Sequence, residues 1–360
     1  MFKKLKNIFN QYRIFVILAA LVPVLGFILF FLRQKPSEAP PVNPVFGNLP
    51  PPETNYDFEP KTEITYQYSV PRNALAQLPV QAKVYQVKKL SDQEVLTRFA
   101  QIATELGFTT KPKFQDSDDY RFYIWEEEDR FLKVNSGTGQ FTFKGFVTLS
   151  VGPISPQEAE TLVKEKMVEW ELVDKEIPTA INFYGSAGME LVPVDNPNAA
   201  NVYEIVFSLS VDGYPLIGFG PAQAVALAQV TNDGKLFTLN YHLLPVSLEE
   251  VGTYPLKPAE TALYQVQQGQ GKILSLKTRP GVETSLSIQN QIKSINLASV
   301  SLVYYESIEK QEYLQPIYLF SGTAVLKDDE VLEVSLYLPA IATEWLIQAS
   351  PTPASRFKVE

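Results

Sequence analysis

Residues that could carry out catalysis are sparse in this sequence. His242 is its only histidine, and it contains no cysteine. A Ser-His-Asp triad or a histidine-ligated metal site would need His242, but one histidine in a strand-like segment is typically structural. The lack of cysteine excludes thiolate catalysis and cysteine-ligated metals. We therefore expect no catalytic residue, no metal and no cofactor.

Two short runs resemble functional motifs only in part. Residues 185–188, Gly-Ser-Ala-Gly, lack the spacing of a nucleophile elbow, so we expect a loop there. Residues 116–119 begin like a calcium-binding loop, but Tyr120 and Arg121 occupy the places of the next ligand and of the glycine, which indicates a solvated turn. A glycosidase needs only two carboxylates at the right separation. Because the chain has 40 acidic residues, an envelope hydrolase stays an alternative.

Aromatic side chains gather in the C-terminal part of the chain. Tyr304, Tyr318 and Phe320 lie in neighbouring strand-like segments, and strand alternation places Tyr318 and Phe320 on the same face. If that face is open, it would bind a peptide, a glycan ring or a partner protein. If a helix over residues 259–268 covers it, these residues form core. We favour core and keep a partner-binding aromatic face as the alternative.

The elements that position these residues alternate between helices and groups of strands. Ser91 with Glu94, and Ser155 with Glu158, form capping boxes before two apolar-faced helices. A third helix is expected over residues 259–268. One strand is expected before the first helix, at residues 82–87. Three strands are expected after each helix: residues 120–125, 131–134 and 140–146 after the first, residues 202–211, 224–231 and 236–243 after the second, and residues 299–305, 313–320 and 331–337 after the third.

This order predicts an α+β fold of repeated helix-plus-antiparallel-meander modules rather than a parallel α/β core. We expect an N-terminal α+β module at residues 61–150, a middle α+β module at residues 151–253 and a C-terminal α+β module at residues 254–360. The edge strand of such a meander could accept a strand from a partner.

The N-terminal region carries a membrane signal. Residues 14–32 contain no charged side chain, and a helix rising about 1.5 Å per residue over this length just crosses a hydrocarbon core of about 30 Å. The segment is longer than the core of a signal peptide and ends without a small-residue cleavage site. Residues 1–13 form a basic tail, which favours a cytoplasmic N-terminus. We expect a single-pass protein of the cell membrane, with residues 36–360 extracytoplasmic.

Residues 33–60 are expected to be a Pro-rich extracytoplasmic linker. Eight prolines lie between Pro36 and Pro60, so the segment should be extended and fairly stiff. Six of the 31 basic residues and none of the 40 acidic residues precede residue 36, which leaves 25 basic against 40 acidic residues beyond it. An acidic ectodomain is poorly suited to phosphate backbones, so we expect no nucleic-acid partner.

A resemblance emerges from four segments in the second half of the chain. They are residues 206–216 (VFSLSVDGYPL), 254–263 (YPLKPAETAL), 300–305 (VSLVYY) and 313–320 (YLQPIYLF). Their spacing resembles the YycH/YycI-type membrane-anchored accessory regulators of a bacterial cell-wall two-component system, and PepSY-like modules, over roughly residues 197–339. The resemblance implies a non-enzymatic regulator. The long Pro-rich spacer and the extra N-terminal module depart from that pattern.

Together these features predict a non-enzymatic, membrane-anchored extracytoplasmic binding or regulatory protein of bacterial type. Its expected partner is an envelope sensor kinase or another membrane protein. The alternatives are a membrane-anchored cell-envelope hydrolase and a peptide-binding or inhibitory PepSY-like module.

Overall fold

The computed structural model describes part of the chain. The described residues are 41–52, 64–88, 90–117, 121–137, 139–146, 152, 154–187, 190–218, 226–242, 248–278, 286–307 and 311–347. The expected membrane span at residues 14–32 lies outside these ranges, as do residues 33–40 and 53–60 of the expected linker. Among the described residues, no helix is long and apolar enough to cross a membrane. Residues Val42–Glu360 form one unit of the chain.

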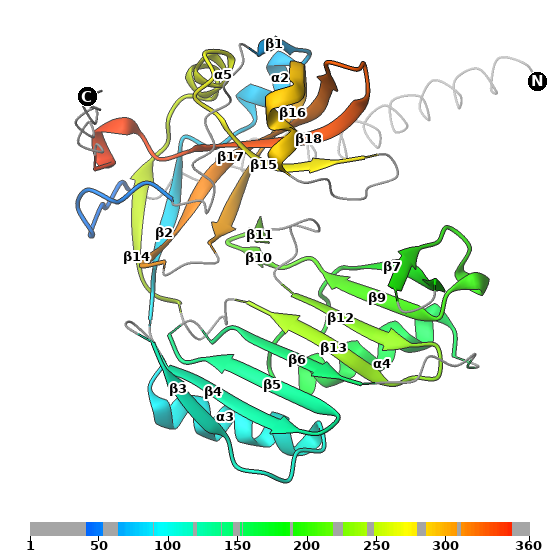
Figure 1. The fold of residues 1–360 in the computed structure, drawn as a ribbon. Helices are drawn as coiled ribbons and strands as arrows, with labels where there is room; N and C mark the ends of the chain where they lie inside the picture. Colours follow the sequence, from blue (N-terminus) through cyan, green and yellow to red (C-terminus); the bar gives the residue numbers. More distant parts are fainter. Residues whose placement is uncertain are drawn as a thin grey trace, which may run out of the picture. The chain divides into compact units, whose positions relative to one another are not determined.

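The fold is mixed α+β and dominated by strands, as the sequence predicts (Figure 1). The strands form two sheets of nine strands each. The described helices are α2 (Arg72–Ala76), α3 (Asp92–Glu105), α4 (Pro156–Glu169) and α5 (Ala259–Gln267), and 3-10 turns cover Pro197–Ala199, Leu286–Gln291 and Thr343–Trp345. Helices α3 and α4 follow the two predicted capping boxes, and α5 lies within the expected range 259–268, whereas the five-residue α2 is not among the expected elements.

The first sheet is antiparallel throughout. Its strands, in spatial order, are β3 (Lys113–Asp116), β4 (Arg121–Glu127), β5 (Arg130–Asn135), β6 (Phe141–Gly145), β13 (Leu236–Tyr241), β12 (Ala226–Thr231), β9 (Val202–Phe207), β7 (Thr179–Ala187) and β8 (Glu190–Pro193). The strands that follow α3 make one half of the sheet, and those that follow α4 make the other. The halves meet where β6 pairs with β13, with Thr142 opposite Asn240.

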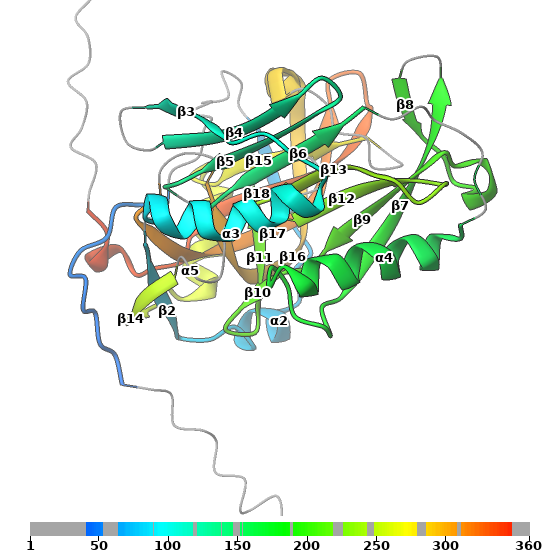
Figure 2. The same ribbon diagram turned by 90° about the horizontal axis from the view of Figure 1, so that it is seen from below.

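Both helices of this sheet begin at the predicted capping boxes. The Ser91 hydroxyl accepts a hydrogen bond from the backbone N–H of Glu94, whose carboxylate accepts one from the backbone N–H of Ser91. Ser155 and Glu158 make the same pair of bonds at the start of α4. The boxes satisfy N–H groups that have no partner within the helix. Helices α3 and α4 both lie on the same side of the sheet (Figure 2).

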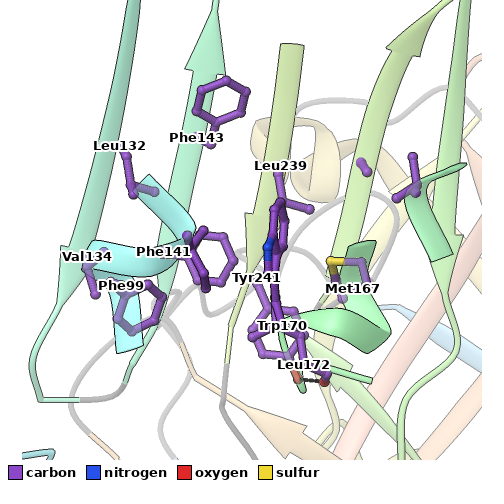
Figure 3. Packing of buried hydrophobic residues seen from close by; sticks show 14 of the residues in the cluster. Phe99, Leu132, Val134, Phe141, Phe143, Met167, Trp170, Leu172, Leu239 and Tyr241 are labelled. Carbon is purple, nitrogen blue, oxygen red and sulfur yellow. Dashed lines mark hydrogen bonds between the residues drawn. The ribbon is translucent and has the colours of Figure 1, made fainter. Parts of the chain in front are cut away.

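The core of the first sheet lies between its strands and these two helices, and it continues from one half to the other. Tyr241 of β13 stacks on Phe141 of β6, with ring centroids 5.7 Å apart and 19° between the planes. Phe99 of α3 meets Phe141 edge-on at 5.2 Å. Figure 3 shows these rings near Trp170, at the end of α4. The two halves therefore share one hydrophobic core.

The second sheet is assembled from separated stretches of the chain. Its main path is β10 (Ser210–Val211), β11 (Tyr214–Gly218), β16 (Ile292–Glu306), β17 (Tyr313–Leu326), β18 (Val331–Pro339) and β15 (Lys272–Lys277); in addition, β1 (Thr65–Tyr68) pairs with β16, and β2 (Gln81–Val87) pairs with β14 (Leu248–Pro255) and β17. The pairs of β1 and β11 with β16 are parallel. Strands β1 and β2, which the expected module at residues 61–150 includes, thus lie in the second sheet, together with the strands of residues 248–339. The module boundaries themselves stay a prediction.

Candidate functional site

The aromatic residues that the sequence singles out lie in the interior. Tyr304 and Phe320 are completely buried, and Tyr318 is 1% exposed. The hydroxyl of Tyr304 donates to the carbonyl of Lys83 at 2.8 Å, and that of Tyr318 donates to the carbonyl of Lys257 at 2.6 Å. Burial raises the pKa of Tyr318 to about 12. In this structure, therefore, these three side chains offer no surface to a partner.

His242 lies at the end of β13 and faces a carboxylate from β16. Its Nδ1 atom is 3.8 Å from Oε2 of Glu306, and Gln140 donates to Oε1 of the same carboxylate at 3.1 Å. Glu306 is buried, whereas His242 is partly exposed. Burial lowers the pKa of His242, which favours the neutral imidazole. At 3.8 Å, Nδ1 of His242 and Oε2 of Glu306 are too far apart for a hydrogen bond.

The run at residues 185–188 differs from its expected conformation. Gly185 and Ser186 belong to β7, where they pair with Val192 and Leu191 of β8. The expectation of a loop is wrong for these residues, because the backbone here is one arm of a hairpin. Of the acidic run at residues 116–119, Asp118 and Asp119 lie outside the described residues. Within the described part of the chain, no three His, Cys, Asp or Glu side chains are placed to hold a metal ion.

The face of the first sheet opposite α3 and α4 carries a row of polar side chains, and we call it the open face. One row across it is formed by Asn182, Glu204, Gln229, Thr238 and Lys144, which lie directly opposite one another on five consecutive strands. Residues directly opposite each other in a sheet point to the same side. Their chain neighbours Ile205 and Phe143 point into the helix-covered core. We call these five residues the polar row.

Glu204 is the centre of this row. It is 7% exposed, and it accepts hydrogen bonds from Nδ2 of Asn182 at 3.1 Å, from the hydroxyl of Tyr184 at 3.3 Å and from Nε2 of Gln229 at 2.9 Å. Burial, followed by the charge of Glu204, raises the pKa of Tyr184 to about 12, so this phenol stays a donor at neutral pH. All three donors are uncharged side chains. Among the described residues, no basic side chain forms an ion pair with Glu204.

The chemistry of the carboxylate fixes the orientation of the two amides. An ionised carboxylate only accepts hydrogen bonds, so Asn182 and Gln229 must turn their NH2 groups toward Glu204. Their carbonyl oxygens then point away from it. Asn182 is exposed and Gln229 is half-buried, so the accessible side of the cluster presents acceptor oxygens around a negative charge. Such a cluster suits a ligand group that donates hydrogen bonds and carries positive charge.

Basic side chains lie on the other half of the open face. Lys144 is exposed and forms no ion pair with the described residues. Lys133 of β5 lies opposite Thr142, and its Nζ atom sits 3.8 Å from the ring centroid of Phe122. The open face thus carries the buried Glu204 on the half that follows α4, and Lys133 and Lys144 on the half that follows α3.

Sequence reasoning does not find the polar row. Its members come from residues 144 to 238, and only the pairing of β6 with β13 brings Lys144 into line with Glu204. One local signal exists, because Glu204 interrupts the otherwise apolar strand VYEIVF of β9. A charge in a strand that is buried along most of its length points to a polar cluster on one face.

Comparisons with known proteins leave the family open. No protein-family model matches the sequence, and no curated protein matches it. Among solved structures, an uncharacterised protein from Eubacterium rectale has 12% sequence identity and a TM-score of 0.44, over 72% of this chain and 82% of that chain. These comparisons assign no function to the chain.

Proposed function

We propose that this protein is a membrane-anchored, non-enzymatic binding protein that recognises a partner outside the cytoplasm through its open face. The observation that carries the proposal is the division of the first sheet. Helices α3 and α4 cover one face, and the other face presents the polar row. A sheet face with ordered polar side chains, an exposed lysine at Lys144 and a hydrogen-bonded carboxylate at Glu204 has the composition of a recognition surface.

The anchor and the partner class rest on the sequence. The uncharged residues 14–32 support a single-pass membrane helix with residues 36–360 extracytoplasmic. The resemblance to YycH/YycI-type regulators, built from repeated helix-plus-meander modules, supports a sensor kinase or similar membrane protein as the partner. Signalling would then pass through contacts of the ectodomain and of the membrane helix.

Photo-crosslinking of the full chain in native membranes tests this proposal. A crosslinking residue at Asn240 probes the open face, and one at the exposed Glu165 of α4 is the matched control on the opposite side. We expect Asn240 to capture one membrane protein that Glu165 does not capture. Exchange of residues 14–32 for an unrelated apolar helix should lower the yield. Capture of no specific protein at Asn240, or equal capture at both positions, would contradict the proposal.

A further inference from the structure

The polar row carries opposite charges at a defined separation. Glu204 lies opposite Gln229, Gln229 opposite Thr238, and Thr238 opposite Lys144. Adjacent strands lie about 4.8 Å apart, so the three steps from β9 to β6 separate the two charged positions by about 14 Å. The side chains between them are uncharged and can both donate and accept hydrogen bonds.

We propose that the polar row binds a short oligopeptide with free termini, its ammonium group at Glu204 and its carboxylate at Lys144. This inference rests on the proposed binding role of the open face and names the ligand class. An extended chain gains about 3.3 to 3.6 Å per residue, so the ends of a peptide of about four residues match the separation of the two charges.

The Glu204 end fits an ammonium group. An ammonium group has three donors and no acceptor, and the carbonyl oxygens of Asn182 and Gln229 are acceptors beside the Glu204 carboxylate. The buried carboxylate lacks a cationic partner among the described residues, so a bound ammonium group would supply its missing charge.

The Lys144 end and the middle of the row select against other charged ligands. A polyamine would place a positive charge at Lys144, and a dicarboxylate would place a negative charge at Glu204. Like charges in such positions repel each other, so the row favours a molecule with one charge of each sign. Between them, the half-buried Gln229 can pair with peptide N–H and C=O groups.

Calorimetric titration of the full chain in detergent with Gly/Ser peptides tests the length. Peptides of about two to six residues bracket the separation of the charges. We expect the tightest binding at about four or five residues and weaker binding at two and at six. Acetylation of the amino terminus and amidation of the carboxyl terminus should each weaken binding about tenfold, because each removes one charged hydrogen bond.

Paired variants locate the two ends. Glu204→Gln should weaken binding of the unmodified peptide about tenfold and leave the affinity of the acetylated peptide unchanged. Lys144→Gln should weaken binding of the unmodified peptide about tenfold and leave the affinity of the amidated peptide unchanged. The exposed residues Glu190 and Lys175 supply matched controls, and Glu190→Gln and Lys175→Gln should bind like the parent chain. If Glu204→Gln fails to fold, the modified peptides together with Lys144→Gln still decide the question.

Several outcomes would overturn the peptide proposal. They are binding of none of the peptides, binding that does not depend on length, or equal effects of acetylation on the parent chain and on Glu204→Gln. If no peptide binds while a crosslinker at Asn240 still captures a membrane protein, the ligand class is wrong and the proposed function stands.

Discussion

At the scale of single residues, Tyr241 joins the two halves of the first sheet. Its ring stacks on Phe141 of the other half, and its buried hydroxyl donates to the carbonyl of Leu172 at 2.6 Å. Tyr241→Phe keeps the ring and leaves that carbonyl without its donor, so we expect a loss of about 1 to 3 kcal/mol in the free energy of unfolding. Urea denaturation of both proteins measures this loss in the free energy of unfolding. Tyr264→Phe, at an exposed ring, is the control and should be neutral; equal stabilities of all three proteins would show that the buried bond contributes nothing.

His242 predicts a pH dependence of stability. Burial lowers its pKa below the ordinary value of 6.5, so the unfolded chain takes up this proton more readily than the folded chain. The contribution of the neutral His242 side chain to the free energy of unfolding is therefore complete above pH 6.5, and it is lost as the pH falls below that value. In His242→Gln this component should vanish. Because the chain has no other histidine, the difference between the two stability profiles reports this group, and parallel profiles would rule the prediction out.

At the scale of elements, the capping boxes hold the two helices that cover the first sheet. Ser91→Ala and Ser155→Ala each remove the acceptor for an N–H at a helix start, so each should cost about 1 kcal/mol of unfolding free energy. Gln93→Ala, at an exposed position of α3, is the control and should change stability little. Thermal unfolding would show the lower stability of the two Ser→Ala variants. A Ser91→Ala protein as stable as Gln93→Ala would mean that the box is not needed.

These boxes also explain what the sequence could predict. Ser91 with Glu94, and Ser155 with Glu158, are local patterns, and both helices begin where the patterns place them. The expected helix at residues 259–268 also predicts that Phe320 is buried. In the structure this helix is α5, and it belongs to the same hydrophobic core as Phe320. The pairings of β6 with β13 and of β2 with β14 join segments far apart in sequence, and no local pattern encodes them. The polar row depends on such a pairing, so no local pattern predicts it.

At the scale of the whole molecule, the two sheets differ in how the chain builds them. The first sheet and both its helices come from residues 90–242, a range that also contributes β10 and β11 to the second sheet, and the core of the first sheet uses residues of that range alone. The core of the second sheet combines α5 with distant side chains, including Leu49 and Val84. The segment from residue 42 to residue 87 is therefore part of the second sheet's core, although the chain of the first sheet separates it from the rest.

This difference predicts how fragments behave. A fragment of residues 90–242 should unfold cooperatively and give a dispersed amide NMR spectrum, because it contains a complete core. A fragment of residues 248–347 alone should not unfold cooperatively. Without β2, strand β14 loses its pairing partner, and apolar surface of α5 is left uncovered. Joining residues 42–88 to the end of the second fragment through a flexible linker should restore folding of the second sheet without its edge strands β10 and β11, since that piece returns Leu49 and Val84 to the core. Cooperative folding of residues 248–347 without that piece would show that the second sheet does not need the N-terminal strands.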